Sequence, residues 1–481
     1  MPHAALPLIR SQAFIGGLWV GRPSLPVLDK ASGAEIARVP DLGAAETREA
    51  ISAAQRALKP WAALLAKERA AILRRWYDLI VENADALALI LTREQGKPLG
   101  EAKGEILYGA GFVEFFAEEA KRVYGETIPT PKAGARILVM KQPIGVVAAI
   151  TPWNFPCAMI TRKVTPALAA GCTAVVKPAE DTPLSALALA FLAERAGLPP
   201  GVLNVVTCRD PVAVGRELTS NALVRMVTFT GSTEVGKILM RDSAATVKKV
   251  ALELGGNAPF IVFDDADLDR AVAGAMASKY RNAGQTCVCA NRIYVQSGIH
   301  DAFAERLAAE VAKLAVGPGV ESGVAIGPLI NADAVAKVEE HVADAVARGA
   351  RVAAGGRRHA LGRTFYEPTI LTGVTREMKV AREETFGPVA PLFRFDTEDE
   401  VIAMANDTPF GLAAYFYTRD LGRAFRIAEA LEFGIVGVNE GIVSTEVAPF
   451  GGVKESGLGR DGSRHGLEEF LEVKYTMIGG L

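Results

Sequence analysis

The sequence predicts an α/β fold built on a doubly wound parallel sheet, and three observations indicate it. Short apolar strands alternate with helices from residue 144 to 254, and the alternation returns between residues 255 and 435. Half of the 481 residues are hydrophobic, which is enough for a large core. Polar motifs follow the ends of several strands, where open sheets of this kind bind ligands.

The composition argues against a nucleic-acid-binding, membrane-spanning, secreted or metal-binding protein. The net charge of −2 gives no electrostatic attraction for nucleic acid or for an anionic membrane. There is no uninterrupted run of about 18 apolar residues and no signal-peptide pattern at the start. Five cysteines without framework spacing indicate a reducing compartment, so we expect a cytoplasmic protein. Because there are only five histidines and no Cys-x-x-Cys pair, no metal site is expected.

The first 124 residues are predicted to be largely helical. Apolar residues at helical spacing predict helices at 44–58, 68–95 and 99–121. The segment 125–142 that follows is extended in pattern and is interpreted as a hairpin that projects from the helical layer.

The regular alternation begins at residue 144. The expected strands are 144–150, 173–176, 202–206, 225–229 and 249–252, and the helices between them are 157–170, 184–196, 212–219 and 233–241. In the second half, helices are expected at 299–314, 334–348 and 397–405, and strands at 413–417 and 434–438. The tail 471–477 is strand-like and is predicted to pair with the hairpin.

The central feature of the sequence is the stretch around Cys287. A helix is predicted over 268–280, Gly284 is expected to stop it in a left-handed conformation, and a strand follows at 292–296. Cys287 would then lie on a tight connection between two packed elements. A cysteine there is either a small buried hydrophobe or a reactive group held on a rigid loop.

Three further motifs follow predicted strands. Asn154 lies between two prolines after strand 144–150, where it can donate to an oxyanion or simply form a turn. Lys177 and Glu180 follow the next strand, where they either meet the adenosine ribose of a dinucleotide or form a solvated turn. Gly231, with Ser232 and Thr233, opens a helix, and a helix N-terminus suits a pyrophosphate.

Two carboxylates complete the candidate residues. Glu253 follows strand 249–252 and stands beside a pair of glycines, which would let substrate or water approach a general base closely. Glu384, in the segment Glu-Thr-Phe-Gly-Pro, is a second acidic candidate.

In this order and spacing, the motifs resemble those of the aldehyde dehydrogenase superfamily over essentially the whole chain. Within it, the chain is similar to the succinate-semialdehyde dehydrogenase branch. The superfamily resemblance is carried by Trp153-Asn154, Lys177 with Glu180, Gly231-Ser232, Glu253-Leu-Gly-Gly, Gly284-Gln-Thr-Cys287 and Glu384-x-Phe386-Gly-Pro. The branch is carried by Ile160-Thr-Arg-Lys163, the segments 279–291 and 438–442, and Pro449 to Arg460.

The resemblance implies a mechanism. Cys287 attacks the aldehyde, the Asn154 amide and the Cys287 backbone N–H hold the thiohemiacetal, and Glu253 activates water to hydrolyse the thioester. The cofactor would be NAD, with NADP disfavoured rather than excluded, because Glu180 would repel its 2′-phosphate while Lys177 partly offsets this. The cofactor-binding residues implied are Trp153, Lys177, Glu180, Gly231, Ser232, Thr233, Leu254, Glu384 and Phe386.

The branch implies that the substrate is succinate semialdehyde, with glutarate semialdehyde or a broader range of aldehydes as the alternative. Its carboxylate would be held by Arg162, Arg281 and Ser444. Arg162 interrupts an apolar helical run, an expensive place for a charge unless it faces a cleft or a partner. Arg281 can equally be a cation that stabilises a helix C-terminus. Ser444 is matched only by its position in a variable loop.

The resemblance also implies the domain organisation. Residues 1–124 and 143–254 would form a Rossmann-like cofactor domain, and residues 255–460 the catalytic domain. Residues 125–142 and 461–481 would form a small β element that assembles a homodimer or homotetramer.

The sequence leaves two alternative functions open. A CoA-acylating enzyme of the same fold would end the cycle with a thiol instead of water, and Glu253 argues against it. A non-catalytic descendant would commonly have lost Cys287.

Cys287 and Cys289 are predicted to form a redox switch, and the alternative is that Cys289 merely packs inward. Inactivation by peroxide that dithiothreitol reverses only while Cys289 is present would identify the switch.

Overall fold

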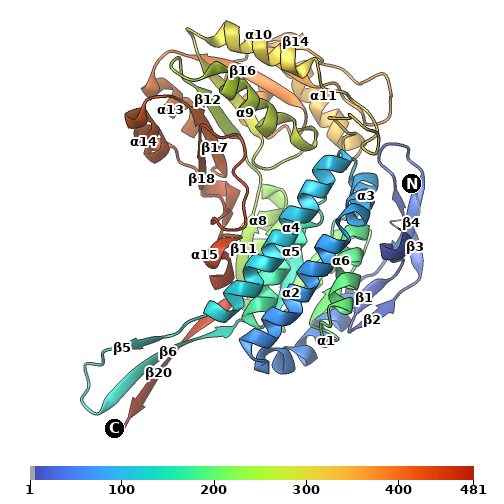
Figure 1. Ribbon diagram of the computed structural model, residues 1–481, viewed down its shortest axis with the longest axis vertical. Helices are drawn as coiled ribbons and strands as arrows, with labels where there is room; N and C mark the ends of the chain where they lie inside the picture. Colours follow the sequence, from blue (N-terminus) through green and yellow to red (C-terminus); the bar gives the residue numbers. More distant parts are fainter. Residues whose placement is uncertain (1–5) are drawn as a thin grey trace.

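Each half of the chain folds around its own large sheet in the computed structural model, which describes residues 6–481 (Figure 1). The first sheet has eight strands in the order β19-β11-β10-β7-β8-β9-β1-β2, and the second has seven in the order β14-β15-β16-β13-β12-β17-β18. The inner strands of both sheets are parallel. The predicted α/β fold is therefore confirmed.

The first sheet has the elements expected for residues 144–254, within a few residues. Its parallel strands are β7 (Val146–Ile150), β8 (Thr173–Lys177), β9 (Leu203–Val205), β10 (Val224–Thr230) and β11 (Lys249–Glu253). The helices between them are α5 (Ala158–Ala170), α6 (Pro183–Arg195), α7 (Pro211–Ser220) and α8 (Thr233–Ser243). The antiparallel edges are β1 (Ala13–Ile15) with β2 (Leu18–Val20) on one side and β19 (Gly457–Leu458) on the other.

The strand order of this sheet reverses between β7 and β10. From β7 the chain moves outward through β8 to β9, and it then returns to form β10 and β11 on the other side of β7. Ligands of doubly wound sheets bind at such a switch point, outside the carboxyl ends of the strands. Since β7 ends at Ile150 and β10 at Thr230, the Asn154 and Gly231 motifs come to the same place.

Helices α1 (Ala44–Ala63), α2 (Ala66–Glu82), α3 (Ala84–Gln95) and α4 (Leu99–Glu119) precede the first sheet in the chain. The prediction of a single helix over 68–95 is wrong, because Asn83 separates α2 from α3. The Asn83 side-chain amide donates to the Leu79 carbonyl at 2.8 Å, at the end of α2. Asparagine side chains compete with helical backbone bonds in this way, and apolar spacing alone did not reveal it.

The second sheet contains the strands expected at 292–296, 413–417 and 434–438 and four strands that the sequence analysis missed. The strands are β12 (Ala258–Val262), β13 (Ala290–Gln296), β14 (Arg351–Ala354), β15 (Thr369–Thr372), β16 (Val389–Phe395), β17 (Ala413–Tyr417) and β18 (Ile435–Val438). The helices are α9 (Leu268–Tyr280), α10 (His300–Val311), α11 (Ala332–Ala347), α12 (Lys379–Arg382), α13 (Glu398–Asn406) and α14 (Leu421–Ala430). Prolines within β12 and β16 obscured these strands, since proline is uncommon inside a sheet.

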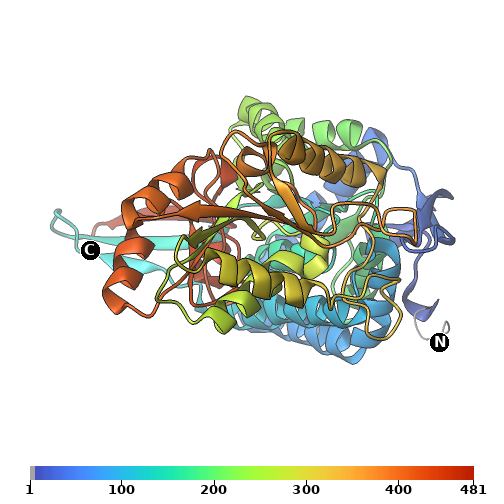
Figure 2. The ribbon, with the colours of Figure 1, turned by 90° about the horizontal axis from the view of Figure 1, so that it is seen from above.

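A three-stranded antiparallel sheet projects from the body of the molecule (Figures 1 and 2). It consists of β5 (Glu126–Ile128), β6 (Ala135–Pro143) and β20 (Leu471–Gly479), and we call it the arm. The register runs from Leu471 opposite Pro143 to Gly479 opposite Ala135, so the predicted pairing of the tail with the hairpin is confirmed.

The remaining elements are short. Strands β3 (Pro23–Leu28) and β4 (Glu35–Pro40) pair with each other, and α15 (Ser463–Glu468) precedes the arm. Within residues 6–481, no helix is both long and apolar enough to cross a membrane.

Candidate active site

The loop before Cys287 is shaped by three consecutive left-handed residues. Asn282, Ala283 and Gly284 have φ angles of 51°, 55° and 74°. Helix α9 ends at Tyr280, as predicted, and Gly284 has the expected left-handed conformation. A Cβ on Gly284 would lie 2.1 Å from the Gly387 carbonyl oxygen, so only glycine fits there. This tight turn determines the position of Cys287, which follows it.

Hydrogen bonds join this loop to Asn154. The Asn154 amide Nδ2 donates to the Gln285 carbonyl at 3.1 Å, and the Asn282 Nδ2 donates to the Asn154 carbonyl at 3.1 Å. An amide nitrogen carries two hydrogens, so Asn154 keeps one that can serve a ligand. The candidate oxyanion donor and the candidate nucleophile are thus held by one network.

A buried ion pair supports the same carbonyl from behind. Lys97 Nζ donates to the Asn154 carbonyl oxygen at 2.8 Å and to Glu105 at 2.6 Å. Glu105 in turn accepts from the backbone N–H groups of Cys157 and Ala158, at 2.9 and 3.3 Å, where α5 begins. The pair connects α4 with α5 and restricts movement of Asn154.

Burial controls the protonation of the two reactive groups. It raises the pKa of Cys287 to about 12, while the positive charge of Arg162 acts in the opposite direction. Burial and the charge of Asp461 raise the pKa of Glu253 to about 8. Glu253 Oε2 has no hydrogen-bond partner among residues 6–481. A carboxyl that titrates near neutral pH with a free oxygen is suited to general-base work.

Two cations lie inside α5, where every residue is buried. Arg162 Nε and Lys163 Nζ both donate to Asp461, at 2.8 and 2.9 Å, and Lys163 also donates to the Thr228 hydroxyl at 3.1 Å. The Arg162 guanidinium packs 4.2 Å from the centre of the Phe450 ring. One carboxylate facing two cations leaves a positive balance close to Glu253 and Cys287.

Two cavities meet at the switch point of the first sheet. One, of about 340 Å³, is lined by Cys287 and by Trp153, Asn154, Gly231, Ser232, Leu254, Glu384 and Phe386. The other, of about 520 Å³, is lined by Lys177 and Glu180. Because both include Pro152, Trp153, Thr230 and Gly231, they form one continuous groove. Its length and its two differently lined ends fit an extended dinucleotide, with the reactive end at Cys287.

The inner end of this groove is rigid. The ring of Trp153 meets that of Phe386 edge to face at 5.4 Å, and Phe386 has a φ of 53°. Glu384 accepts from the Gly256 N–H at 3.0 Å, and burial raises its pKa to about 7. The Glu384 carboxyl is therefore held in place before any ligand arrives.

The residues at the start of α8 are partly engaged with the protein itself. The Ser232 hydroxyl accepts from the Val235 N–H at 3.3 Å, and the Thr233 hydroxyl donates to the Glu455 carbonyl at 3.3 Å. The Gly231 N–H donates to the Glu253 carbonyl at 3.1 Å. At the outer end of the groove, Lys177 Nζ forms an ion pair with Glu180.

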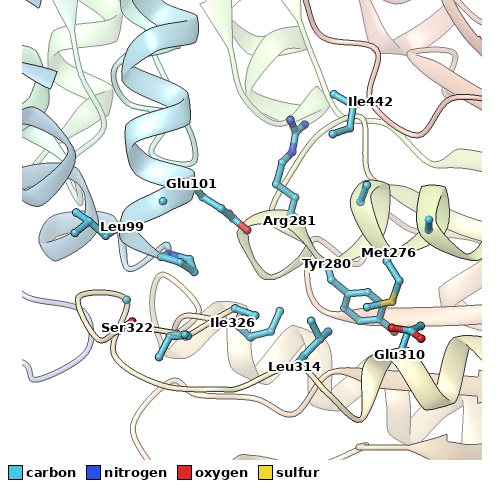
Figure 3. Close-up of a pocket in the computed structure, with 18 of the residues that line it drawn as sticks. Leu99, Glu101, Met276, Tyr280, Arg281, Glu310, Leu314, Ser322, Ile326 and Ile442 are labelled. Carbon is cyan, nitrogen blue, oxygen red and sulfur yellow. The ribbon is translucent and has the colours of Figure 1, made fainter. Parts of the chain in front are cut away.

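A third cavity, of about 1380 Å³, lies against α9 and α10 and has Arg281 on its wall. Figure 3 shows Arg281 with Glu101 on one side and Ile442 on the other. The Arg281 guanidinium packs 5.5 Å from the centre of the Phe155 ring. Its Nε is buried and has no partner in the described part of the chain.

Two predicted residues lie apart from these groups. Ser444 is half-buried in the loop after β18, and no hydrogen bond joins it to Arg162 or Arg281 within residues 6–481. Cys289 is buried, and its thiol donates to the Lys279 carbonyl at 3.4 Å, which is the inward packing named as the alternative to a redox role.

Sequence reasoning missed the residues that support the site. Lys163 stands next to Arg162 in an apolar helix, so two adjacent charges there could have signalled a buried acidic partner. Its partner Asp461 lies 298 residues further on, and no local pattern links the two. Lys97 and Glu105 read as ordinary helix-surface charges.

The chain is similar to known proteins and to solved structures along nearly its whole length. A model of the aldehyde dehydrogenase family matches residues 19–476. The chain is 64% identical to glutarate-semialdehyde dehydrogenase of Pseudomonas aeruginosa, covering 98% of this chain and 99% of that one. It is also 64% identical to succinate-semialdehyde dehydrogenase [NADP(+)] of Escherichia coli, covering 98% of each. The crystal structure of succinate-semialdehyde dehydrogenase from Burkholderia pseudomallei matches with a TM-score of 0.97 and 64% identity, over 98% of this chain and 99% of that one.

Proposed function

Because the chain belongs to the aldehyde dehydrogenase family, we propose that it oxidises succinate semialdehyde to succinate with NAD or NADP. The observation that carries the proposal is Arg162, a buried cation beside Cys287 and Glu253 whose Nη2 has no partner within residues 6–481. An unpaired buried guanidinium nitrogen calls for an anion on the substrate. Glutarate semialdehyde is the second candidate, since relatives of both names match equally well.

The groups around Cys287 support the family reaction. Burial keeps Cys287 a thiol at neutral pH, so it loses its proton to solvent before it reacts, which the charge of Arg162 favours. Its sulfur then adds to the aldehyde carbon, and the free Asn154 N–H donates to the oxygen that becomes negative. One such donor contributes about 3 kcal/mol to the transition state. A bound nicotinamide cofactor supplies the hydride acceptor for the oxidation that follows. Glu253 then takes a proton from the water that hydrolyses the thioester on Cys287.

Glu253 also bears on the alternative in which CoA ends the cycle. Its carboxyl lies close to Gly451, where a Cβ would come within 2.9 Å of Oε1. That glycine leaves room for the carboxyl beside the reacting groups. A base positioned to activate water favours an acid product over an acyl thioester.

The substrate carboxylate would be clamped by Arg162 and Arg281. Both are flanked by aromatic rings, Phe450 for Arg162 and Phe155 for Arg281, which exclude water and strengthen the attraction to an anion. Ser444 has weaker support, because no contact of its own links it to either arginine among the described residues. We therefore assign the clamp to the two arginines and keep Ser444 as a secondary contact.

The cofactor preference depends on the Lys177–Glu180 ion pair. Glu180 is partly exposed at the outer end of the groove, where it can accept hydrogen bonds from ribose hydroxyls. The charge of Lys177 is already used by this carboxylate, so little of it remains for a 2′-phosphate. We infer a preference for NAD, with NADP still accepted.

The arm supports assembly of several copies of the chain. Val473, Tyr475 and Met477 alternate along β20 and therefore share one face, and they are 68%, 58% and 44% exposed. Tyr475 pairs with Val139, and Met477 with Ile137. An exposed apolar face on a projecting sheet is typical of an interface. We propose that the arm forms a homodimer or homotetramer.

The cysteines support a reducing compartment, and we place the protein in the cytoplasm. All five are free thiols. The redox exchange between Cys287 and Cys289 stays a prediction. It would require Cys289 to leave its bond to the Lys279 carbonyl.

The first prediction concerns Cys287 and Glu253. Cys287→Ala should abolish turnover. Glu253→Gln should accumulate the thioester, giving a burst of NADH without steady turnover. Because the pKa of Glu253 is raised to about 8, the carboxylate is the minor form at lower pH. The kcat of the wild type should therefore rise as pH increases through about 8. A flat profile between pH 6 and 9 would argue against Glu253 as the base.

The second prediction concerns the clamp and the substrate. Arg281→Met should raise KM for succinate semialdehyde about ten- to a hundredfold, since a hydrogen bond to a charged group contributes about 1.5–3 kcal/mol. Butanal, which has no charge, should be little affected. Arg270→Met removes an exposed arginine from α9, the helix that ends just before Arg281, and is the matched control. Equal losses for both aldehydes would refute the clamp.

The third prediction concerns the cofactor. The wild type should show a higher kcat/KM with NAD than with NADP, and Glu180→Ser should shift the ratio towards NADP by about tenfold or more, because one repelled charge is removed and Lys177 is released. Steady-state kinetics with both cofactors measures the ratio. An unchanged ratio in Glu180→Ser would show that this carboxylate does not select the cofactor.

The fourth prediction concerns assembly. Light scattering should give a mass of two or four chains at micromolar concentration. Tyr475→Lys with Met477→Lys should reduce it, because charges would replace the apolar face of the arm. A wild-type protein that is monomeric under these conditions contradicts the proposal.

A further inference from the structure

Several buried hydrogen-bond donors near Cys287 lack an acceptor, and three of them belong to large side chains. These three are Arg162 Nη2, Arg281 Nε and the hydroxyl of Tyr108, and none has a partner among residues 6–481. Buried polar atoms in native proteins are nearly always bonded. The two arginines belong to the proposed clamp, whereas Tyr108 has no role in the site as described so far. Because arginine can only donate, the group that would satisfy these atoms together is an acceptor with more than one oxygen.

The ring of Tyr108 lies one aromatic side chain away from Arg162 of the proposed clamp. Tyr108 lies on α4, and its ring meets that of Phe112 edge to face at 4.9 Å. The Phe112 ring centre is 5.9 Å from the Arg162 guanidinium carbon, so one aromatic side chain touches both groups. The charges that act most strongly on the phenol are those of Arg162, Arg281 and Cys287.

The hydroxyl is a donor at neutral pH. Burial raises the pKa of Tyr108, so the proton stays on the oxygen, and the two arginine charges only partly oppose this. A protonated phenol that donates to a carboxylate forms a short, charge-assisted bond. The charges of Arg162 and Arg281 act on the phenol more strongly than those of Cys287 and Asp461, and this positive balance favours the arrival of an anion.

We propose that the Tyr108 hydroxyl donates a third hydrogen bond to the terminal carboxylate of the aldehyde, beside Arg162 and Arg281. This inference rests on the proposed function and deepens it. A site that hydrogen-bonds an anion also rejects the analogue that lacks one, because its buried donors then stay unpaired. Tyr108 is accordingly a specificity residue, which favours a carboxylated aldehyde over an uncharged one of the same length.

The test is Tyr108→Phe in the full-length protein, with succinate semialdehyde and butanal as substrates. Phenylalanine keeps the edge contact with Phe112 and removes only the hydroxyl. For succinate semialdehyde we expect kcat/KM to fall about ten- to a hundredfold, mainly through KM. For butanal we expect no loss. The inhibition constant of succinate, which has the carboxylate but no aldehyde, should rise by the same factor as KM.

Tyr77→Phe is the matched control, since Tyr77 lies on α2 with its ring against Arg74 at 4.6 Å and should change neither substrate. Equal losses for both substrates in Tyr108→Phe would indicate a merely structural hydroxyl and overturn the inference. Unchanged kinetics, with a wild-type preference for the charged aldehyde, would overturn the role of Tyr108 alone. A wild type without that preference would overturn both the proposed function and this inference.

Discussion

The site depends on the neutralisation of two cations inside α5. A helix whose residues are all buried is an unfavourable place for Arg162 and Lys163, because an unpaired buried charge costs several kcal/mol. Asp461 accepts from both, and burial works against its charge, but the two cations outweigh burial and lower its pKa. One negative charge against two positive ones leaves a surplus. This net positive charge acts on Cys287 and Glu253. The ion pairing inside the core therefore also makes the pocket around Cys287 electropositive.

The second constraint is the positioning of Asn154. Its backbone carbonyl accepts hydrogen bonds from Lys97 and Asn282, and its side-chain amide donates to the Gln285 carbonyl. Both the backbone and the side chain of Asn154 are therefore held in place. Preorganised donors stabilise developing charge without the cost of reorientation. Lys97 and Glu105 are buried and paired, and they join the helical layer to the first turn of α5. The helices that precede the first sheet in the chain thus take part in holding the loop that carries Cys287.

Much of this could be predicted from the sequence, and the limits are physical. The strands of the first sheet were found because apolar β-branched runs alternate with helices, and the motifs after β7, β10 and β11 marked its switch point. The break at Asn83 was missed because it depends on a side-chain bond, which apolar spacing does not report. The bounds of α9 and the left-handed Gly284 were predicted, but the left-handed Asn282 and Ala283 were missed, because alanine gives no signal for that conformation.

Long-range partners were the other limit. No residue near Arg162 in the sequence indicates that Asp461 is its partner. The sequence around Tyr108 likewise does not distinguish it from a tyrosine that packs in a core. The resemblance of the motifs supplied the family and the candidate residues. The electrostatic balance around Cys287 required the coordinates, because it depends on which buried atoms find partners and which do not.

The pairing of α5 with Asp461 also has a consequence for biosynthesis. Arg162 leaves the ribosome 299 residues before the carboxylate that neutralises it, and β19, which closes one edge of the first sheet, is formed by residues 457–458. The amino-terminal sheet therefore cannot finish folding as the chain is synthesised. Until the last segment emerges, the nascent chain carries two uncompensated charges in α5 and an open sheet edge. Such a chain has a high contact order and a long exposure to aggregation.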